Sequence, residues 1–169
     1  MQRKRRSQKA KASIRRSANT PKTAGSRADR DGSWTCPKCL KRFARLNQHH
    51  MCERVGVEEV ASVTTPELEE VLKRLIAFTS RLPGCQVSTS KKAVTFSLKV
   101  AFAFVHPKPR WLDLCLFLSE APDDPRLKRV TSYSKKRLAC FLRLHEAEEY
   151  DSSVNDLLVR AHATAQPQK

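Results

Sequence analysis

Four residues between positions 36 and 52 have the side chains and the spacing of a metal-binding site: Cys36, Cys39, His49 and Cys52. Three thiolates and one imidazole suit the tetrahedral coordination that zinc adopts in proteins. A Cys-x2-Cys turn lets both sulfur atoms approach one ion while backbone N–H groups face them. Because this Cys3His set leaves no coordination position open, the sequence predicts one structural zinc ion per chain rather than a catalytic one.

The identity of the histidine ligand depends on the local backbone. If residues 44–52 form a helix, His49 and Cys52 stand at positions i and i+3 and share one face of it. His50 would then point elsewhere, so His49 is the preferred ligand and His50 is the alternative.

The segment around these ligands is too short to have a core of its own. Metal binding would therefore supply its folding free energy, with Phe43 and Leu46 as an apolar plug. Two other interpretations are a redox Cys-x-x-Cys motif and a set of uncoordinated residues. The redox interpretation lacks the strand-and-helix context of a redox fold, which favours zinc.

The net charge of the chain is distributed unevenly. The 169 residues include 33 Lys and Arg and 17 Asp and Glu, a formal charge of +16. Residues 1–30 contribute +10 of this charge, residues 31–55 contribute +3 and residues 56–169 contribute +3. The first segment has too few apolar side chains to offset its ordering entropy, so we expect a disordered basic arm.

A basic, acid-poor arm attracts phosphate groups without sequence preference, and this favours a nucleic-acid contact. A solubilising tail, a nuclear address and an organellar transit peptide are the alternatives for the same composition. The predicted nucleic-acid contacts are basic residues in three parts of the chain: Arg3, Lys4, Arg5, Arg6, Arg15 and Arg16 in the arm, Lys41, Arg42 and Arg45 beside the cysteines, and Lys108, Arg110, Lys128 and Arg129 further on.

The chain after residue 64 has the pattern of a folded domain. Thr65 and Pro66 predict the start of a helix in which apolar residues recur at a spacing of three to four, and Pro83-Gly84 stops it. Alternation from Val94 to Phe104 predicts two strands with a turn near residues 97–99.

Further alternation predicts strands from Trp111 to Leu118 and from Leu138 to Leu144. A closing amphipathic helix is expected to carry the following apolar residues: Ala147, Tyr150, Val154, Leu157, Leu158 and Ala161. This order of elements predicts an α+β domain in which two helices flank an antiparallel sheet.

The sequence thus predicts five segments. They are the disordered basic arm over 1–33, the zinc-finger module over 34–53, a linker over 54–64, the α+β domain over 65–164 and a tail over 165–169. The domain has about 100 residues, which is enough to fold alone.

The charges of the predicted domain separate by element. Residues 91–143 carry a formal charge of +8, whereas residues 56–90 carry −2 and residues 144–169 carry −3. If both helices pack on one face of the sheet, the other face and the loops form a positive surface suited to phosphate. A sheet edge guarded by lysines against pairing is the alternative interpretation.

Enzymatic function has little support in the sequence. Cys85, Cys115 and Cys140 are candidate nucleophiles and His106 and His145 are candidate bases, but no pattern joins them. The chain has four glycines, none of them clustered, which excludes a glycine-rich phosphate loop. We therefore expect a non-enzymatic protein, with a hydrolase or a nuclease-like enzyme as the remote alternative.

Residues 34–52 and several later stretches resemble a known family. The first resembles a short zinc-binding segment found ahead of the "domain of unknown function 5655" family, and Phe102–Lys108, Trp111–Leu114 and Asp124–Val130 are similar to the body of that family. The resemblance covers roughly residues 34–163 and leaves the arm unmatched.

The family resemblance implies an α+β fold akin to small bacterial helix-and-sheet domains suspected of nucleic-acid binding, without an established activity or catalytic residues. In the family the histidine is followed directly by Ser-Cys. By that spacing His50 takes the ligand position two before Cys52, whereas geometry favours His49.

The composition also bears on location and partners. No apolar run approaches the ~20 residues of a membrane span, and no secretory signal is expected. Six cysteines without an export signal favour metal binding or free thiols over disulfides. We expect a cytoplasmic protein, associated with the nucleoid or the ribosome if it is bacterial, with the nucleus as the alternative.

The expected partner is nucleic acid, either DNA or RNA. A protein-interaction or scaffold module with a structural zinc is the alternative. Neither a membrane nor a small-molecule substrate is inferred.

Overall fold

The computed structural model describes residues 32–39, 42–43, 45–48, 52 and 55–166. The predicted arm contacts lie outside the described residues: Arg3, Lys4, Arg5, Arg6, Arg15 and Arg16. Within the described part of the chain, no helix has the length and apolar character needed to cross a membrane.

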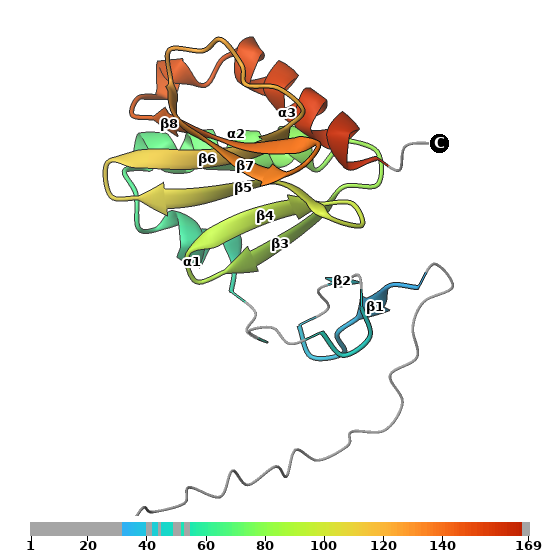
Figure 1. Ribbon diagram of the computed structural model, residues 1–169. Helices are drawn as coiled ribbons and strands as arrows, with labels where there is room; N and C mark the ends of the chain where they lie inside the picture. Colours follow the sequence, from blue (N-terminus) through green and yellow to red (C-terminus); the bar gives the residue numbers. More distant parts are fainter. Residues whose placement is uncertain (1–31, 40–41, 44, 49–51, 53–54, 167–169) are drawn as a thin grey trace, which may run out of the picture.

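A six-stranded antiparallel sheet forms the centre of the C-terminal domain (Figure 1). Its strands are β3 (Gln86–Ser90), β4 (Ala93–Ser97), β5 (Ala101–Lys108), β6 (Trp111–Leu118), β7 (Leu127–Ser134) and β8 (Arg137–Leu144). They lie in the order β3-β4-β5-β6-β8-β7. After β6 the chain therefore passes to the outer edge as β7, and β8 returns between these two strands.

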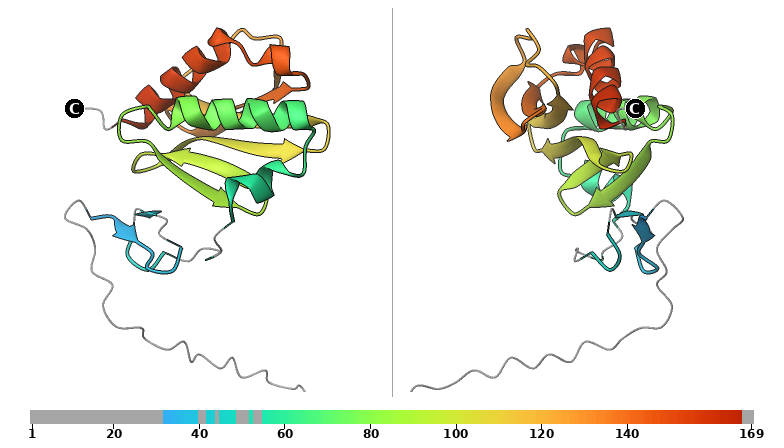
Figure 2. Two further views of the ribbon diagram at one scale, coloured as in Figure 1. Left: turned by 180° about the vertical axis from the view of Figure 1, so that it is seen from behind. Right: turned by 45° about the vertical axis from the view of Figure 1, so that its right-hand side comes forward.

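Three helices cover one face of this sheet: α1 (Val57–Ala61), α2 (Pro66–Thr79) and α3 (Ser152–Ala165) (Figure 2). The hydroxyl of Thr65 accepts a hydrogen bond from the N–H of Leu68 at the start of α2. The carboxylate of Asp151 does the same for α3 by accepting from Ser153 and Val154. Both helices thus begin at polar residues that satisfy otherwise unpaired N–H groups.

The main core lies between the sheet and these helices. On β6 the four residues Leu112, Leu114, Leu116 and Leu118 all point to the covered face, and each is at most 1% exposed. α3 packs on β5 and β6, and α2 packs on α3 and β6. Burying one such leucine side chain is worth about 1.5–3 kcal/mol, so this face provides most of the domain's hydrophobic stabilisation. The predicted α+β class, with an antiparallel sheet and flanking helices, is confirmed.

Three details differ from the sequence-based expectations. The predicted linker over 54–64 contains α1, and its Val60 and Ala61 are buried in the core. The strands β3 and β7 were not predicted, because their mostly polar sequences lack a run of alternating apolar residues.

The third difference is the start of the closing helix. α3 begins at Ser152, whereas Ala147 lies in a short 3-10 helix, η1 (Ala147–Glu149), and Tyr150 precedes the cap. The reason is the carboxylate of Asp151, which caps a helix only from the position before its first residue.

Candidate functional site

A two-strand hairpin positions the first two cysteines. Strand β1 (Trp34–Thr35) pairs with β2 (Arg42–Phe43), with Trp34 opposite Phe43 and Thr35 opposite Arg42. The residues between these strands include a turn over residues 37–39, so Cys36 and Cys39 lie at the same end of the hairpin. The guanidinium Nε of Arg42 donates to the hydroxyl of Ser33 at 2.6 Å, which ties the two strands together.

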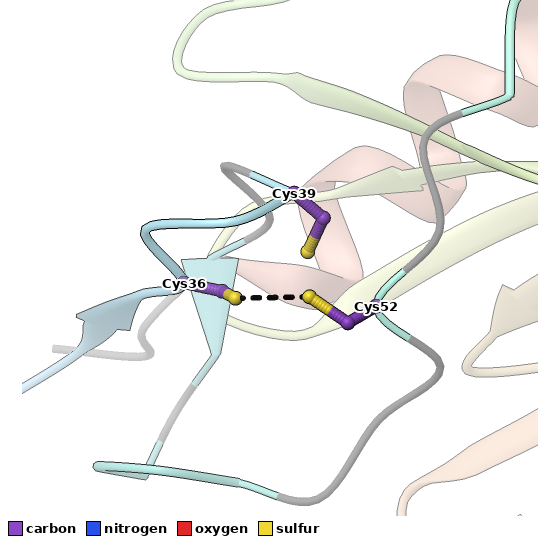
Figure 3. Close-up of side chains that lie close together, drawn as sticks. All are labelled: Cys36, Cys39 and Cys52. Atoms are coloured by element: carbon purple, nitrogen blue, oxygen red, sulfur yellow. Dashed lines mark hydrogen bonds between the residues drawn. The ribbon is translucent and has the colours of Figure 1, made fainter. Parts of the chain in front are cut away.

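The sulfur atoms of Cys36, Cys39 and Cys52 converge on one point (Figure 3). All three lie within 4.8 Å of one another, and the Cys36 and Cys52 sulfurs are 3.4 Å apart. A tetrahedral metal ion with bonds of about 2.3 Å would hold thiolates about 3.8 Å apart. The spacing of these sulfurs therefore fits one metal ion among them.

The ionisation of these thiols also favours a cation. Burial raises the pKa of Cys36, but hydrogen bonds from the backbone N–H groups of Cys39 and Lys38 and from the neighbouring thiols outweigh it, so that the pKa falls to about 6. Desolvation and the neighbouring sulfurs raise the pKa of Cys52 to about 11. The negative charge of one thiolate thus opposes ionisation of the neighbouring thiol. A bound cation would offset the repulsion between the thiolates.

A small apolar cluster supports the cysteines. Trp34 is 6% exposed, packs beside Cys36 and Cys39, and its ring centroid lies 5.7 Å from that of Phe43. The predicted plug was therefore correct for Phe43 and wrong for Leu46, which is 48% exposed. Trp34 takes the place of Leu46 because the hairpin register sets it directly opposite Phe43.

The described part of the predicted 44–52 helix is a turn. The N–H of Gln48 bonds to the carbonyl of Arg45 at 3.3 Å, and Asn47 has a φ of 53°. A left-handed residue cannot continue a right-handed helix, and asparagine tolerates this conformation better than most residues. The helix on which the preference for His49 depends is therefore not formed over residues 45–48. The candidate ligands His49 and His50 and the basic Lys41 lie outside the described residues.

The second candidate site is a hollow of about 550 Å³ on the face of the sheet opposite the helices. Its lining includes three of the predicted nucleic-acid contacts: Lys108, Lys128 and Arg129. The fourth, Arg110, is exposed in the turn between β5 and β6 and does not line the hollow. Arg42 and Arg45 are also exposed, in the cysteine hairpin and the turn after it.

Strand register builds the floor of this hollow. Phe104 on β5 lies opposite Cys115 on β6, and Cys115 lies opposite Phe141 on β8. On its other side, Phe141 lies opposite Arg129 on β7. Directly paired residues share one face of an antiparallel sheet. Four strands thus contribute one continuous row, in which the Arg129 guanidinium lies 4.1 Å from the centroid of the Phe141 ring.

A second row runs parallel to the first. His106, Asp113 and Arg143 face one another across β5, β6 and β8. Arg143 Nε donates to Asp113 Oδ1 at 2.8 Å, and its guanidinium lies 4.4 Å from the Trp111 ring centroid. Arg143 is thereby held against the sheet at the rim of the hollow.

The hollow has a positive electrostatic character. Lys108, Lys128, Arg129 and Arg143 line it together with the carboxylate of Asp113. Burial lowers the pKa of His106, and nearby Lys108 lowers it further, while a contact from Nδ1 to the Lys92 carbonyl at 3.0 Å opposes both. His106 is therefore mainly neutral at pH 7, and the positive charge comes from the four long side chains.

The cysteines of the domain remain thiols. Burial raises the pKa of Cys115 to about 12, and it also raises the pKa of Cys85 and of Cys140. Because the thiolate is the nucleophilic form, none of these three side chains is activated.

Sequence reasoning missed several residues of the hollow as binding candidates: Phe104, Phe141 and Arg143. Alternation within each strand was the available signal, since Phe104 and Lys108 share one face of β5, and Phe141 and Arg143 share one face of β8. The pairing of β8 between β6 and β7, which brings these faces together, is not visible in any one strand.

A small cysteine module followed by a six-stranded α+β domain defines the class of this protein. The family model described as "Domain of unknown function (DUF5655)" matches residues 57–165. The match covers more than half of the chain, so the protein belongs to this family, and the Cys36, Cys39 and Cys52 cluster precedes the matched region. Comparison with curated proteins and with solved structures gave no match.

Proposed function

We propose that this protein is a non-enzymatic nucleic-acid-binding protein that contacts the phosphate backbone through its basic arm, its cysteine module and the open face of its sheet. The observation that carries the proposal is the hollow on that face, where four basic side chains gather around one carboxylate. Fixed positive charge in a concave surface attracts polyanions and concentrates them there.

The opposite side of the domain has the other sign of charge. The short helix α1 and the first turn of α2 carry a group of acidic residues: Glu58, Glu59, Glu67 and Glu69. A polyanion approaching the domain is therefore attracted to the open sheet face and repelled by α1 and the start of α2. The sequence of residues 1–30, with 11 basic residues and one acidic residue, would add a second, non-selective attraction.

In this proposal the metal is a structural zinc ion. Cys36, Cys39 and Cys52 would be three of its ligands and His49 the fourth, with His50 as the alternative. When bound, such an ion supplies folding free energy rather than chemistry. The module would then hold Arg42 and Arg45 on a fixed support.

Salt dependence of binding tests the proposal. The affinity of the full-length protein for labelled duplex and single-stranded oligonucleotides is measured by fluorescence anisotropy at several salt concentrations. A plot of log affinity against log salt should have a slope of about −0.9 per duplex phosphate neutralised. Deleting residues 1–30 should flatten this slope without abolishing binding by the domain. A full-length protein that shows no salt-dependent binding to either nucleic acid would overturn the proposal in favour of a protein-interaction module.

Elemental analysis tests the metal separately. Purified protein should contain about one zinc per chain, and Cys36→Ser should lose it. The same analysis of His49→Ala and His50→Ala identifies the fourth ligand. Cys85→Ser, which alters a cysteine far from the cluster in sequence, is the matched control and should keep its zinc. A metal-free preparation in which Trp34 remains buried would contradict the zinc assignment.

A further inference from the structure

The open face of the sheet has an apolar cluster of its own, separate from the main core. Cys115, Phe117 and Ala139 are its buried members, and Phe104 and Phe141 pack against them while partly exposed. Single apolar side chains are common on protein surfaces, but a contiguous apolar cluster marks a binding surface.

The aromatic rings of this face form a continuous strip. Neighbouring ring centroids are 6.4 Å apart between Phe141 and Phe104, 6.0 Å between Phe104 and Phe117, and 4.5 Å between Phe117 and Tyr133. The strip therefore consists of rings from the four neighbouring strands β5, β6, β8 and β7. It is accessible at two places, the hollow beside Phe104 and Phe141, and Tyr133, which is 61% exposed.

Arginine side chains lie along the strip. The guanidinium of Arg129 is 4.1 Å from the Phe141 centroid, and that of Arg137 is 5.1 Å from Phe117 and 5.9 Å from Tyr133. The guanidinium planes lie over these rings, and both aromatic rings and guanidinium planes are groups on which a nucleobase stacks. Lys108 and Lys128 at the hollow supply point charges for the adjoining phosphates.

Building on the nucleic-acid binding proposed above, we propose that the open sheet face binds single-stranded nucleic acid, with one base stacked in the hollow on Phe104 and on the Arg129 guanidinium that lies over Phe141, and another on Tyr133. The phosphates between them contact the lysines and arginines at the edges of the strip. The positive charge of this face favours a polyanion as its ligand. The aromatic strip favours a polyanion whose bases have exposed planar faces.

The same chemistry disfavours a duplex at this face. In a double helix each base is stacked on its neighbours, so its π-face is not available to a protein ring without unstacking. A single strand can turn its bases outward onto an aromatic platform, as single-strand-binding and RNA-binding sheets do. The domain should therefore prefer single strands, whereas the basic arm should bind both forms.

The test compares affinities for a single strand of about 16 nucleotides and for the corresponding duplex, measured by fluorescence anisotropy with the full-length protein. Tyr133→Leu and Phe141→Leu remove a ring but keep an apolar side chain. Each should weaken single-strand binding by roughly 5- to 100-fold and leave duplex binding nearly unchanged. Tyr133→Phe retains the ring and should retain the affinity.

Two controls separate stacking from charge and from folding. Lys128→Gln should weaken both nucleic acids and reduce the salt slope, whereas Lys73→Gln, on the helix-covered side, should change neither. Since Tyr133 is exposed, its variants should unfold at the wild-type temperature, so that a loss of binding cannot reflect a loss of structure.

The outcomes distinguish this inference from the proposed function. If no oligonucleotide binds, both proposals fail. If single strand and duplex bind equally and the leucine variants change neither affinity, the single-strand inference is overturned and the proposed function stands. A free mononucleotide that competes as strongly as the oligonucleotide would also overturn the inference, because the hollow would then be a nucleotide pocket.

Discussion

The cysteine module and the α+β domain are stabilised by different physical means. In the module, Trp34 and Phe43 pack around Cys36 and Cys39, and this is the whole apolar cluster of its described residues. The domain instead buries leucine, valine and phenylalanine side chains between six strands and three helices. A short segment needs a strong local ligand to order it, whereas a domain of about 100 residues can rely on hydrophobic area.

The two tryptophans of the chain report on the two regions separately. Trp34 belongs to the module and Trp111 to strand β6 of the domain. In Trp34→Phe and Trp111→Phe variants the remaining tryptophan therefore follows one region alone.

Removing the proposed zinc should produce the largest effect, and only in the module. Apparent zinc-binding free energies for modules of this size are about 10–16 kcal/mol at pH 7, so chelation should unfold the hairpin. The fluorescence of Trp34 should shift to the red in the Trp111→Phe variant, while Trp111 in the Trp34→Phe variant should not change. A parallel change of Trp111 would show that the domain depends on the metal.

Phe96→Ala should have the next largest effect, and only in the domain. Phe96 is fully buried on β4 beside Phe102, and truncating such a ring costs about 3–5 kcal/mol. Urea unfolding followed by Trp111 measures this loss, and the zinc content should stay at the wild-type value. Val87→Ala at a 37% exposed position is the control, with an expected change of less than about 0.5 kcal/mol.

Asp124→Asn should have an intermediate effect on the domain. Arg126 donates from Nε to Asp124 Oδ1 at 2.9 Å and also forms an ion pair with Asp151. It therefore links the loop between β6 and β7 to the start of α3. Hydrogen bonds to charged groups are worth about 1.5–3 kcal/mol, so the loss should be about 2 kcal/mol by urea unfolding.

The same ion pair predicts a pH dependence. Hydrogen bonds from Arg126 lower the pKa of Asp124, and bonds from Ser153 and Arg126 lower that of Asp151 to about 2. A carboxylate with a lowered folded-state pKa contributes its full stability above its unfolded pKa of about 4 and loses it as the pH falls toward the folded value. Stability should therefore decline from pH 5 to pH 2, and the decline should be shallower in Asp124→Asn. An equally steep decline in both proteins would exclude this carboxylate as a cause.

Thr65→Ala should have a smaller effect on stability than zinc removal, Phe96→Ala or Asp124→Asn. It removes the hydroxyl that accepts from the N–H of Leu68 at the start of α2, a bond of 3.4 Å. Losing a helix cap of this kind costs about 1 kcal/mol. Thr65→Ser keeps the oxygen and should restore the urea midpoint, whereas an equal loss in both variants would indicate packing rather than capping.

The helices and strands that sequence analysis predicted correctly are those with strong local signals. Thr65 and Pro66 preceded a regular apolar spacing, and α2 begins there. Leucines occupy every second position from Leu112 to Leu118, and β6 spans this segment. By contrast, β7 is exposed along most of its length and has no apolar face that a sequence pattern could identify.

The two candidate sites differ in the same way. The cysteine cluster could be predicted because Cys36 and Cys39 are separated by one turn of chain. The hollow could not, because Phe104, Phe141 and Arg129 are on three strands whose order, β5-β6-β8-β7, does not follow the chain. Three of its four basic residues, Lys108, Lys128 and Arg129, were predicted one by one, whereas Arg143 and the aromatic floor were missed.

The sequence by itself determined the type of each strong element, the converging cysteines and the uneven charge along the chain. These properties follow from residues close together in sequence, where spacing and composition control geometry. Only the tertiary structure decided that Phe141 and Arg129 lie opposite each other, that Phe104 shares their row, and that helices leave this face open. Register sets those neighbours, and register is the joint result of packing six strands against one core.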